Sequence, residues 1–199
     1  MELIPLGQDI FWVPGVLSPE ICQHVIQIVN SQELRAAGIL LDTVDTHIRA
    51  SDILNLGGIQ PLLQSTNQLL MSCLLPVQKL LHRTYGIGFY DMEAISILRY
   101  RPGQFYKRHV DNVLLNSRQM ELVQGIPTRD IGIVGYLNAD FTGGETYFDR
   151  QGVMVKPEMW AVVVFPAYYT HPHQALPVQS GVKYVITTWL FHSRSIRGP

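Results

Sequence analysis

The chain has 199 residues, of which 47% are hydrophobic and 16% charged, enough for one domain with a full core. Its formal net charge of −1 excludes a broad basic face that would recruit nucleic acid or anionic lipid. Apolar runs of about 18 residues, as a membrane span needs, are absent. The first residues lack a signal-peptide pattern, so we expect a cytoplasmic protein.

Helical signals dominate the first 88 residues. Ser18-Pro19-Glu20 combines a capping hydroxyl, a proline suited to the first helical position and an acid, and it predicts a helix start. A second helix is predicted from about Ile59 to Arg83, with Pro76 expected to kink it or divide it. Residues 39–58, between the helices, read as short strands and a loop. Both cysteines fall in predicted helices, and we expect free thiols rather than a disulfide.

Strand signals separated by glycine- and proline-rich turns follow residue 88. The segments rich in valine, isoleucine and aromatic residues are Ala94–Tyr100, Ile131–Leu137, Thr146–Phe148, Val153–Val155, Ala161–Phe165 and Lys183–Phe191. Many short strands in one unit indicate a sandwich or jelly roll. The last segment is apolar on both alternating faces, so we expect helices on its outer face and the barrel interior on the other.

One short pair of residues carries the first chemical signal. His109 and Asp111 are two positions apart, so in a strand both side chains would point the same way. With His173 from another strand, they would supply the two imidazoles and one carboxylate that are typical of non-haem Fe(II) oxygenases. Taken alone, a His-x-Asp pair in a chain with seven histidines is equally compatible with a surface pair.

Lys183 is the next informative residue because it shares a strand face with Val185, Thr187 and Trp189. A buried ammonium is costly unless an anion meets it. Two interpretations stay open at this point. The lysine extends to the rim, or its anion arrives with a bound cosubstrate.

The order of several segments gives a family resemblance. Tyr100–Tyr106 (YRPGQFY), the His109–Asp111 pair, Tyr136-Leu137-Asn138, Gly143–Thr146, His173 and Gly181–Trp189 together resemble the prolyl 4-hydroxylase-like branch of the Fe(II)/2-oxoglutarate-dependent dioxygenases. The resemblance covers about residues 96–192. It implies a double-stranded β-helix, or jelly roll, in a mainly β, α+β fold.

The resemblance also implies the roles of individual residues. His109, Asp111 and His173 would hold Fe(II), with 2-oxoglutarate and dioxygen as cosubstrates and ascorbate in support. His171 competes with His173, but the ten-residue offset to Lys183 favours His173. The resemblance places four residues around 2-oxoglutarate: Lys183 and Thr187 at its far carboxylate, Tyr136 hydrogen-bonded to the same carboxylate, and Tyr100 lining the pocket near the metal.

Substrate contacts are expected at the mouth. Arg129 matches a family arginine that touches substrate, although a surface arginine is an equal alternative, and we also expect Trp189 to contact substrate. The Asn112–Thr128 segment reads as an active-site lid. Trp160 departs from the pattern, because the family usually has glycine there.

We therefore expect one dioxygenase domain spanning residues 1–199, with 1–88 as a helical support region and 89–199 as the catalytic jelly roll. The expected reaction is hydroxylation of an unactivated C–H, first of a prolyl residue in a peptide or protein, second of free proline or another amino acid. The alternative of another class is a metal-binding jelly-roll sensor without turnover. No nucleic-acid or membrane partner is expected, and monomer and dimer both stay open.

Overall fold

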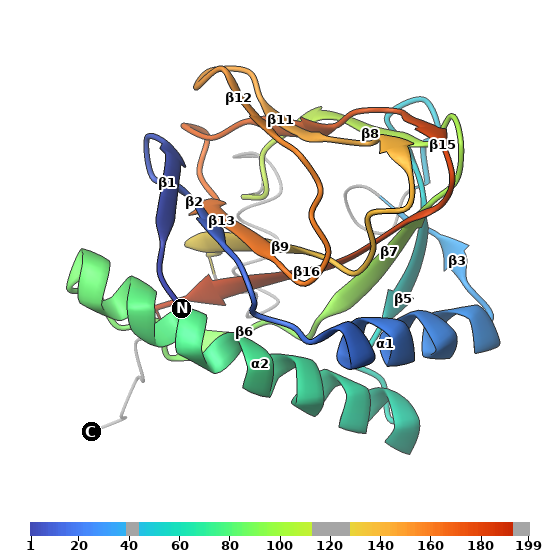
Figure 1. The fold of residues 1–199 in the computed structure, drawn as a ribbon, viewed down its shortest axis with the longest axis horizontal. Coiled ribbons are helices and arrows are strands. Elements are labelled where there is room, and N and C mark those ends of the chain that lie inside the picture. Colours follow the sequence, from blue (N-terminus) through green and yellow to red (C-terminus); the bar gives the residue numbers. More distant parts are fainter. Residues whose placement is uncertain (39–43, 113–127, 193–199) are drawn as a thin grey trace.

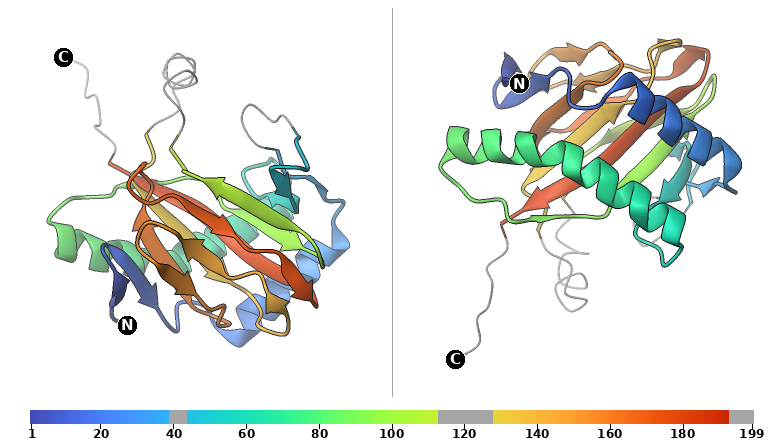
Figure 2. Two further views of the ribbon diagram at one scale, coloured as in Figure 1. Left: turned by 90° about the horizontal axis from the view of Figure 1, so that it is seen from above. Right: turned by 60° about the horizontal axis from the view of Figure 1, so that its bottom comes forward.

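The computed structural model of the chain describes residues 1–38, 44–112 and 128–192. Two antiparallel sheets face each other, and two helices cross the outer face of the larger sheet (Figures 1 and 2). This arrangement confirms the mainly β jelly-roll prediction with supporting helices.

The larger sheet holds nine strands. Its order is β1 (Ile4–Gly7), β2 (Ile10–Val13), β13 (Val162–Pro166), β9 (Ile131–Tyr136), β16 (Lys183–Phe191), β7 (Ser96–Tyr100), β5 (Asp52–Asn55) and β3 (Arg35–Ala36), with β6 (Asp91–Met92) paired to β16. The smaller sheet has the order β12 (Val153–Val155), β11 (Thr146–Phe148), β14 (His173–Ala175), β8 (Phe105–His109) and β4 (Arg49–Ala50). A two-stranded ribbon joins β10 (Thr142–Gly143) to β15 (Val178–Ser180).

Both predicted helices are present. α1 (Pro19–Ser31) begins where expected, with the Ser18 hydroxyl accepting the backbone N–H of Ile21 at 3.2 Å. α2 (Pro61–Tyr85) runs through Pro76 as one helix and ends at Gly86 in the left-handed conformation. Buried leucines on both sides of Pro76 pack on the sheet, and this packing outweighs the roughly 3 kcal/mol that an interior proline costs.

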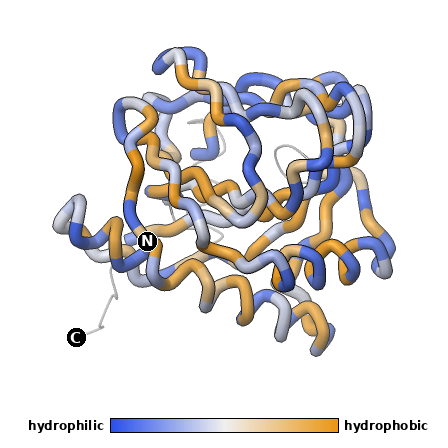
Figure 3. Tube along the Cα trace, in the orientation of Figure 1, coloured by the Kyte–Doolittle hydropathy of each residue, from blue (hydrophilic) through white to orange (hydrophobic). Residues whose placement is uncertain are grey.

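Two apolar clusters hold the layers together. The outer cluster joins α1 and α2 to the outer face of the large sheet, where Ile186 and Leu190 of β16 are buried. The inner cluster lies between the sheets and includes Val185 of β16. β16 is therefore covered on both faces, as its sequence predicted. In Figure 3, hydrophobic and hydrophilic residues alternate along α2, as expected for a helix that packs one face on the sheet.

Short strands accompany the helices before residue 88. β4 and β5 lie within residues 39–58, where short strands were predicted, whereas β1, β2 and β3 were not predicted. β2 pairs with β13, for example with Val13 opposite Val162. Strands of two to four residues are too short to show a period in the sequence, and distant partners fix them. The predicted lid, apart from its end residues Asn112 and Thr128, falls outside the described residues.

Trp160 has a positive φ of 65°, a conformation that glycine adopts without strain. Its backbone N–H donates to Tyr136 O at 3.0 Å, and its carbonyl accepts the N–H groups of Val16 and Leu17. The turn thereby ties β9 to the start of α1. A left-handed turn is the physical reason for the glycine that the resemblance expects here.

Cys22 and Cys73 are free thiols in α1 and α2, as expected. Within the described ranges, no helix combines the length and hydropathy needed to cross a membrane.

Candidate active site

Three donor groups converge between the sheets. His109, the last residue of β8, lies opposite His173, the first residue of β14, and Asp111 follows β8 in a bend. The Asp111 Oδ1 atom lies 3.5 Å from His109 Nε2 and 3.6 Å from His173 Nε2. The strand ends before Asp111, which corrects the expectation of a pair within one strand, but both side chains still face the same point.

Backbone carbonyls orient both imidazoles. His109 Nδ1 lies 2.8 Å from Lys107 O, and His173 Nδ1 lies 3.2 Å from His171 O. A carbonyl only accepts hydrogen bonds, so Nδ1 carries the proton in each ring. The two Nε2 lone pairs then point toward the carboxylate, so the three groups together form a donor set that a cation can occupy. Donor spacing and chemistry both fit an octahedral divalent metal with open positions.

The protonation states suit metal binding. Burial lowers the pKa of His173 to about 4, although the Asp111 carboxylate opposes this shift. Burial alone would raise the pKa of Asp111, but His173, His109 and the Trp189 indole N–H together hold it below its usual range. At neutral pH the site therefore presents a neutral imidazole and an ionised carboxylate, the forms that bind metal.

Aromatic packing restrains the ligands. The Tyr106 ring stacks on His109 at 3.5 Å and 16°, and the Phe165 ring packs edge-on against His173 at 4.6 Å. Gly132 of β9 leaves room for the carboxylate, because a Cβ there would lie 2.8 Å from Asp111 Oδ2.

His171 lies outside this cluster. Its Nε2 is 2.8 Å from Gln8 O and its Nδ1 is 2.9 Å from the Thr170 hydroxyl, so both nitrogens have structural partners. The geometry therefore favours His173 over His171 as the ligand.

A cavity of about 350 Å³ extends from the three donors to Lys183. Lys183 is 2% exposed, and its Nζ donates to Gly144 O at 2.6 Å. Burial lowers the pKa of this amine to about 7, partly offset by Glu145. Among the described residues, no carboxylate lies within 4.0 Å of Nζ. The deep end of the cavity thus has a cationic donor that lacks a contacting anion.

Two tyrosine rings lie near Lys183, and Thr187 lines the same cavity. Its Nζ is 5.1 Å from the Tyr100 ring centre and 5.7 Å from that of Tyr136, and Tyr100 and Thr187 line the cavity. The Tyr136 hydroxyl is hydrogen-bonded to Thr146 at 2.8 Å, and Thr146 is part of the cavity wall. The sequence reasoning missed Thr146, although it directly follows the glycines and acid of the Gly143–Thr146 segment.

Arg129 lines the mouth, but its charge already has a partner. Its Nε and Nη2 donate to Glu93 at 2.8 and 2.7 Å, and its guanidinium lies 3.6 Å above the Trp189 ring centre. Nη1 also donates to Asp111 O at 3.2 Å. Glu93 was missed because a salt bridge between two segments far apart in the sequence leaves no local pattern.

The sequence reasoning also missed two rim residues, Arg49 and Tyr106. The Arg49 guanidinium lies 4.5 Å from the Tyr106 ring centre, and both side chains line the cavity. Tyr106 lies three residues before His109, so the sequence alone could have indicated an aromatic ring beside this metal ligand.

The family model described as the 2OG-Fe(II) oxygenase superfamily matches residues 95–191. A protein of Acanthamoeba polyphaga mimivirus, provisionally named a prolyl 4-hydroxylase, is 26% identical over 90% of this chain and 72% of its own length.

Solved structures share the fold. The prolyl hydroxylase of Trichoplax adhaerens in complex with a hypoxia inducible factor peptide fragment has a TM-score of 0.74 at 19% identity, over 96% of this chain and 88% of that one. The viral collagen prolyl hydroxylase of Paramecium bursaria Chlorella virus-1, in its 2OG complex, has a TM-score of 0.65 at 23% identity, over 92% and 96%.

Fold, site and family match together define a 2-oxoglutarate-dependent dioxygenase. Residues 95–191 form a 2OG-Fe(II) oxygenase superfamily domain, and the relative and the solved structures described above are named prolyl hydroxylases.

Proposed function

We propose that this dioxygenase hydroxylates a prolyl residue in a peptide or protein, with Fe(II) held by His109, Asp111 and His173. The observation that carries the proposal is that one cavity has the three metal donors at one end and the buried Lys183 at the other. A mere metal sensor needs no such cationic pocket. The relatives named prolyl hydroxylases support the prolyl residue as the target.

Each end of the cavity has a distinct task. Lys183 donates a charge-assisted hydrogen bond to the far carboxylate of 2-oxoglutarate, and Thr187 adds a hydroxyl. Tyr100 closes the wall near the metal, and Tyr136 supports the same carboxylate directly or through the Thr146 hydroxyl.

Bound iron(II), with 2-oxoglutarate and dioxygen, supplies the oxidising power to insert one oxygen atom into a C–H bond, and leaves succinate and carbon dioxide. The chain contributes orientation and exclusion of water. Its ring stacks and carbonyl contacts hold His109 and His173 with their Nε2 atoms inward, and Trp189 helps to keep the pKa of Asp111 below its usual range, so that the carboxylate stays ionised. Arg129 and Trp189 form the mouth where the prolyl ring would enter.

The test is succinate release and mass spectrometry with Fe(II), 2-oxoglutarate and ascorbate. A panel of proline-containing peptides is compared with free proline and other amino acids. The proposal expects peptides that gain one oxygen atom on proline. Oxygenation of a free amino acid with all peptides inert would contradict it and identify a small-metabolite hydroxylase.

A further inference from the structure

The charges of the cavity lining are not all balanced. Glu93 neutralises Arg129, Asp111 faces the two histidines, and Lys183 lies at the deep end. Two further cations, Arg35 and Arg49, also line the cavity. Within the described part of the chain, neither has a carboxylate within 4.0 Å.

These two arginines come from opposite sheets. Arg35 lies on β3, the edge strand of the large sheet (Figure 1), opposite Ile53 of the cavity wall. Arg49 lies on β4, the edge strand of the small sheet, opposite Tyr106. One uncompensated cation from each sheet therefore flanks the open side of the sandwich.

Arg49 is held in place by neutral groups. Its Nη1 donates to Gly38 O at 2.9 Å, and its Nε donates to the Ser51 hydroxyl at 3.3 Å. These contacts fix the guanidinium without neutralising it. A preorganised, uncompensated guanidinium favours an incoming carboxylate, because little side-chain entropy is lost when the ion pair forms.

The position of Arg49 determines how far a carboxylate bound to it would lie from the metal site. Its guanidinium, the Tyr106 ring and the His109 ring form one stack, with 4.5 Å and 3.5 Å between successive members. A carboxylate on Arg49 would therefore lie on the order of 10 Å from a metal at His109. An extended peptide advances about 3.3 Å per residue, so this span equals roughly three residues.

We propose that the cavity mouth selects acidic peptides: Arg49 binds an aspartate or glutamate side chain about three residues from the hydroxylated proline, and Arg35 binds a second acidic side chain. The inference rests on the peptide hydroxylase function proposed above and narrows its substrate class. Free proline has no second carboxylate that could reach these arginines while its ring lies at the metal.

The test compares matched peptides that contain one proline and carry either Asp or Asn two to four residues away on each side. Peptide affinity is measured by calorimetry with Mn(II) and 2-oxoglutarate without dioxygen, and kcat/KM is measured with Fe(II). We expect about tenfold tighter binding of the Asp peptides at low salt, with a smaller difference at high salt. Arg49→Gln and Arg35→Gln should each reduce this preference, and the double variant should abolish it.

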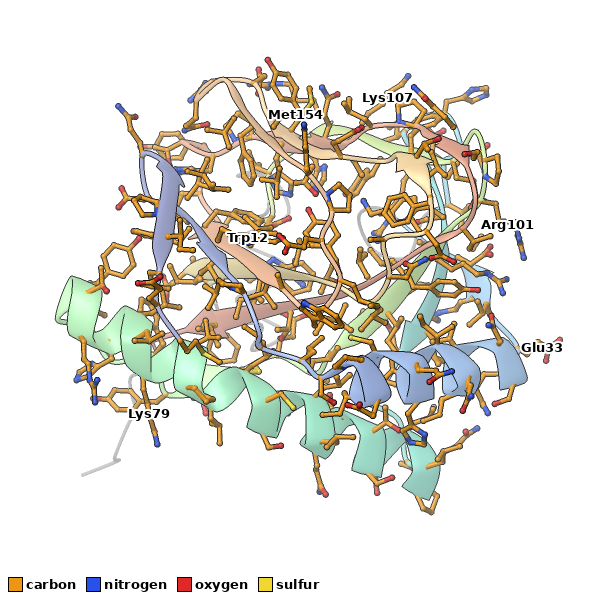
Figure 4. All side chains as sticks on the ribbon, in the orientation of Figure 1. Trp12, Glu33, Lys79, Arg101, Lys107 and Met154 are labelled. Atoms are coloured by element: carbon orange, nitrogen blue, oxygen red, sulfur yellow. The ribbon has the colours of Figure 1, made fainter. Side chains whose placement is uncertain are left out.

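Arg101→Gln is the matched control. Arg101 is 52% exposed, pairs with Asp52 and projects away from the body of the protein in Figure 4. This variant should keep the full preference. Arg49→Lys should keep part of it, because the charge remains while the fork geometry is lost. Succinate formation without peptide is measured for every variant, so that any change at the metal and cosubstrate ends is separated from a change in peptide preference.

Equal affinity of Asp and Asn peptides for the unaltered protein would overturn the inference, as would an unchanged preference in the double variant. The proposed hydroxylase function would survive either result if the peptides were still oxygenated. An Asp preference in binding that depends on both arginines, without oxygenation of any peptide, would support the acidic subsite and contradict the hydroxylase function.

Discussion

Replacement of Lys183 by alanine tests the cosubstrate end of the cavity most sharply. The amine has one protein partner, Gly144 O, and no described carboxylate in contact. A charge-assisted hydrogen bond to a bound carboxylate contributes roughly 1.5–3 kcal/mol. We therefore expect Lys183→Ala to weaken 2-oxoglutarate binding about ten- to hundredfold, and Thr187→Val to have a smaller effect in the same direction.

The pKa of Lys183 adds a pH signature. Without bound cosubstrate, the pKa of the Lys183 amine is about 7. A bound carboxylate would raise this pKa because it favours the ammonium form. Below pH 7 the amine is already protonated. Above pH 7 binding must take up a proton, so affinity should fall as pH rises, by up to about tenfold per pH unit.

The assay is anaerobic calorimetry with Mn(II), repeated at pH 8 in buffers of different ionisation enthalpy to count protons. The unaltered protein should take up close to one proton on binding 2-oxoglutarate, and Lys183→Ala should take up none. Lys79→Ala is the control and should behave as the unaltered protein, because Lys79 is an exposed residue of α2 (labelled in Figure 4) that is not part of the cavity lining. Identical affinity and proton uptake in Lys183→Ala would refute the pocket assignment.

Three further predictions concern the metal, the mouth and the fold. His109→Ala, Asp111→Ala and His173→Ala should each abolish Mn(II) binding measured by calorimetry. His171→Ala should still bind Mn(II) but lose about 1–3 kcal/mol of stability, because the buried groups that His171 contacts lose a hydrogen-bond partner. Metal binding that survives His173→Ala but not His171→Ala would reverse the assignment. Arg129→Ala should lower peptide turnover and leave succinate formation without peptide nearly unchanged; equal loss of both rates would show that Arg129 acts only through its contacts with Glu93 and Asp111. Trp160→Gly should be about 1 kcal/mol more stable than Trp160→Ala in urea unfolding, because only glycine adopts a φ of 65° without strain. A Trp160→Ala variant as stable as Trp160→Gly, or more stable, would argue against strain at this turn.

The sequence alone was sufficient to predict features that depend on the residue pattern within one strand. The alternation along Lys183–Phe191 predicted a strand covered on both faces. The family resemblance, through the offset from His173 to Lys183, favoured the histidine that the fold brings next to Asp111. The departure at Trp160 was visible in the sequence, but its cause, a left-handed turn, required the backbone.

Other features depend on partners that are distant in sequence. Glu93 meets Arg129 only because β9 and the segment before β7 both lie beside β16. β1 and β2 are four residues each, and their pairing with β13 follows from tertiary packing rather than from periodicity. The stack of Arg49, Tyr106 and His109 likewise needs the register of β4 against β8.

The most direct test of the account is the ratio of succinate formed to oxygen gained by a proline peptide under labelled dioxygen. One labelled oxygen atom on the prolyl residue per succinate, with both products lost in Asp111→Ala, is the result that the account predicts. Succinate without an oxygenated prolyl residue across the peptide panel, or oxygenation that persists in Asp111→Ala, would contradict it.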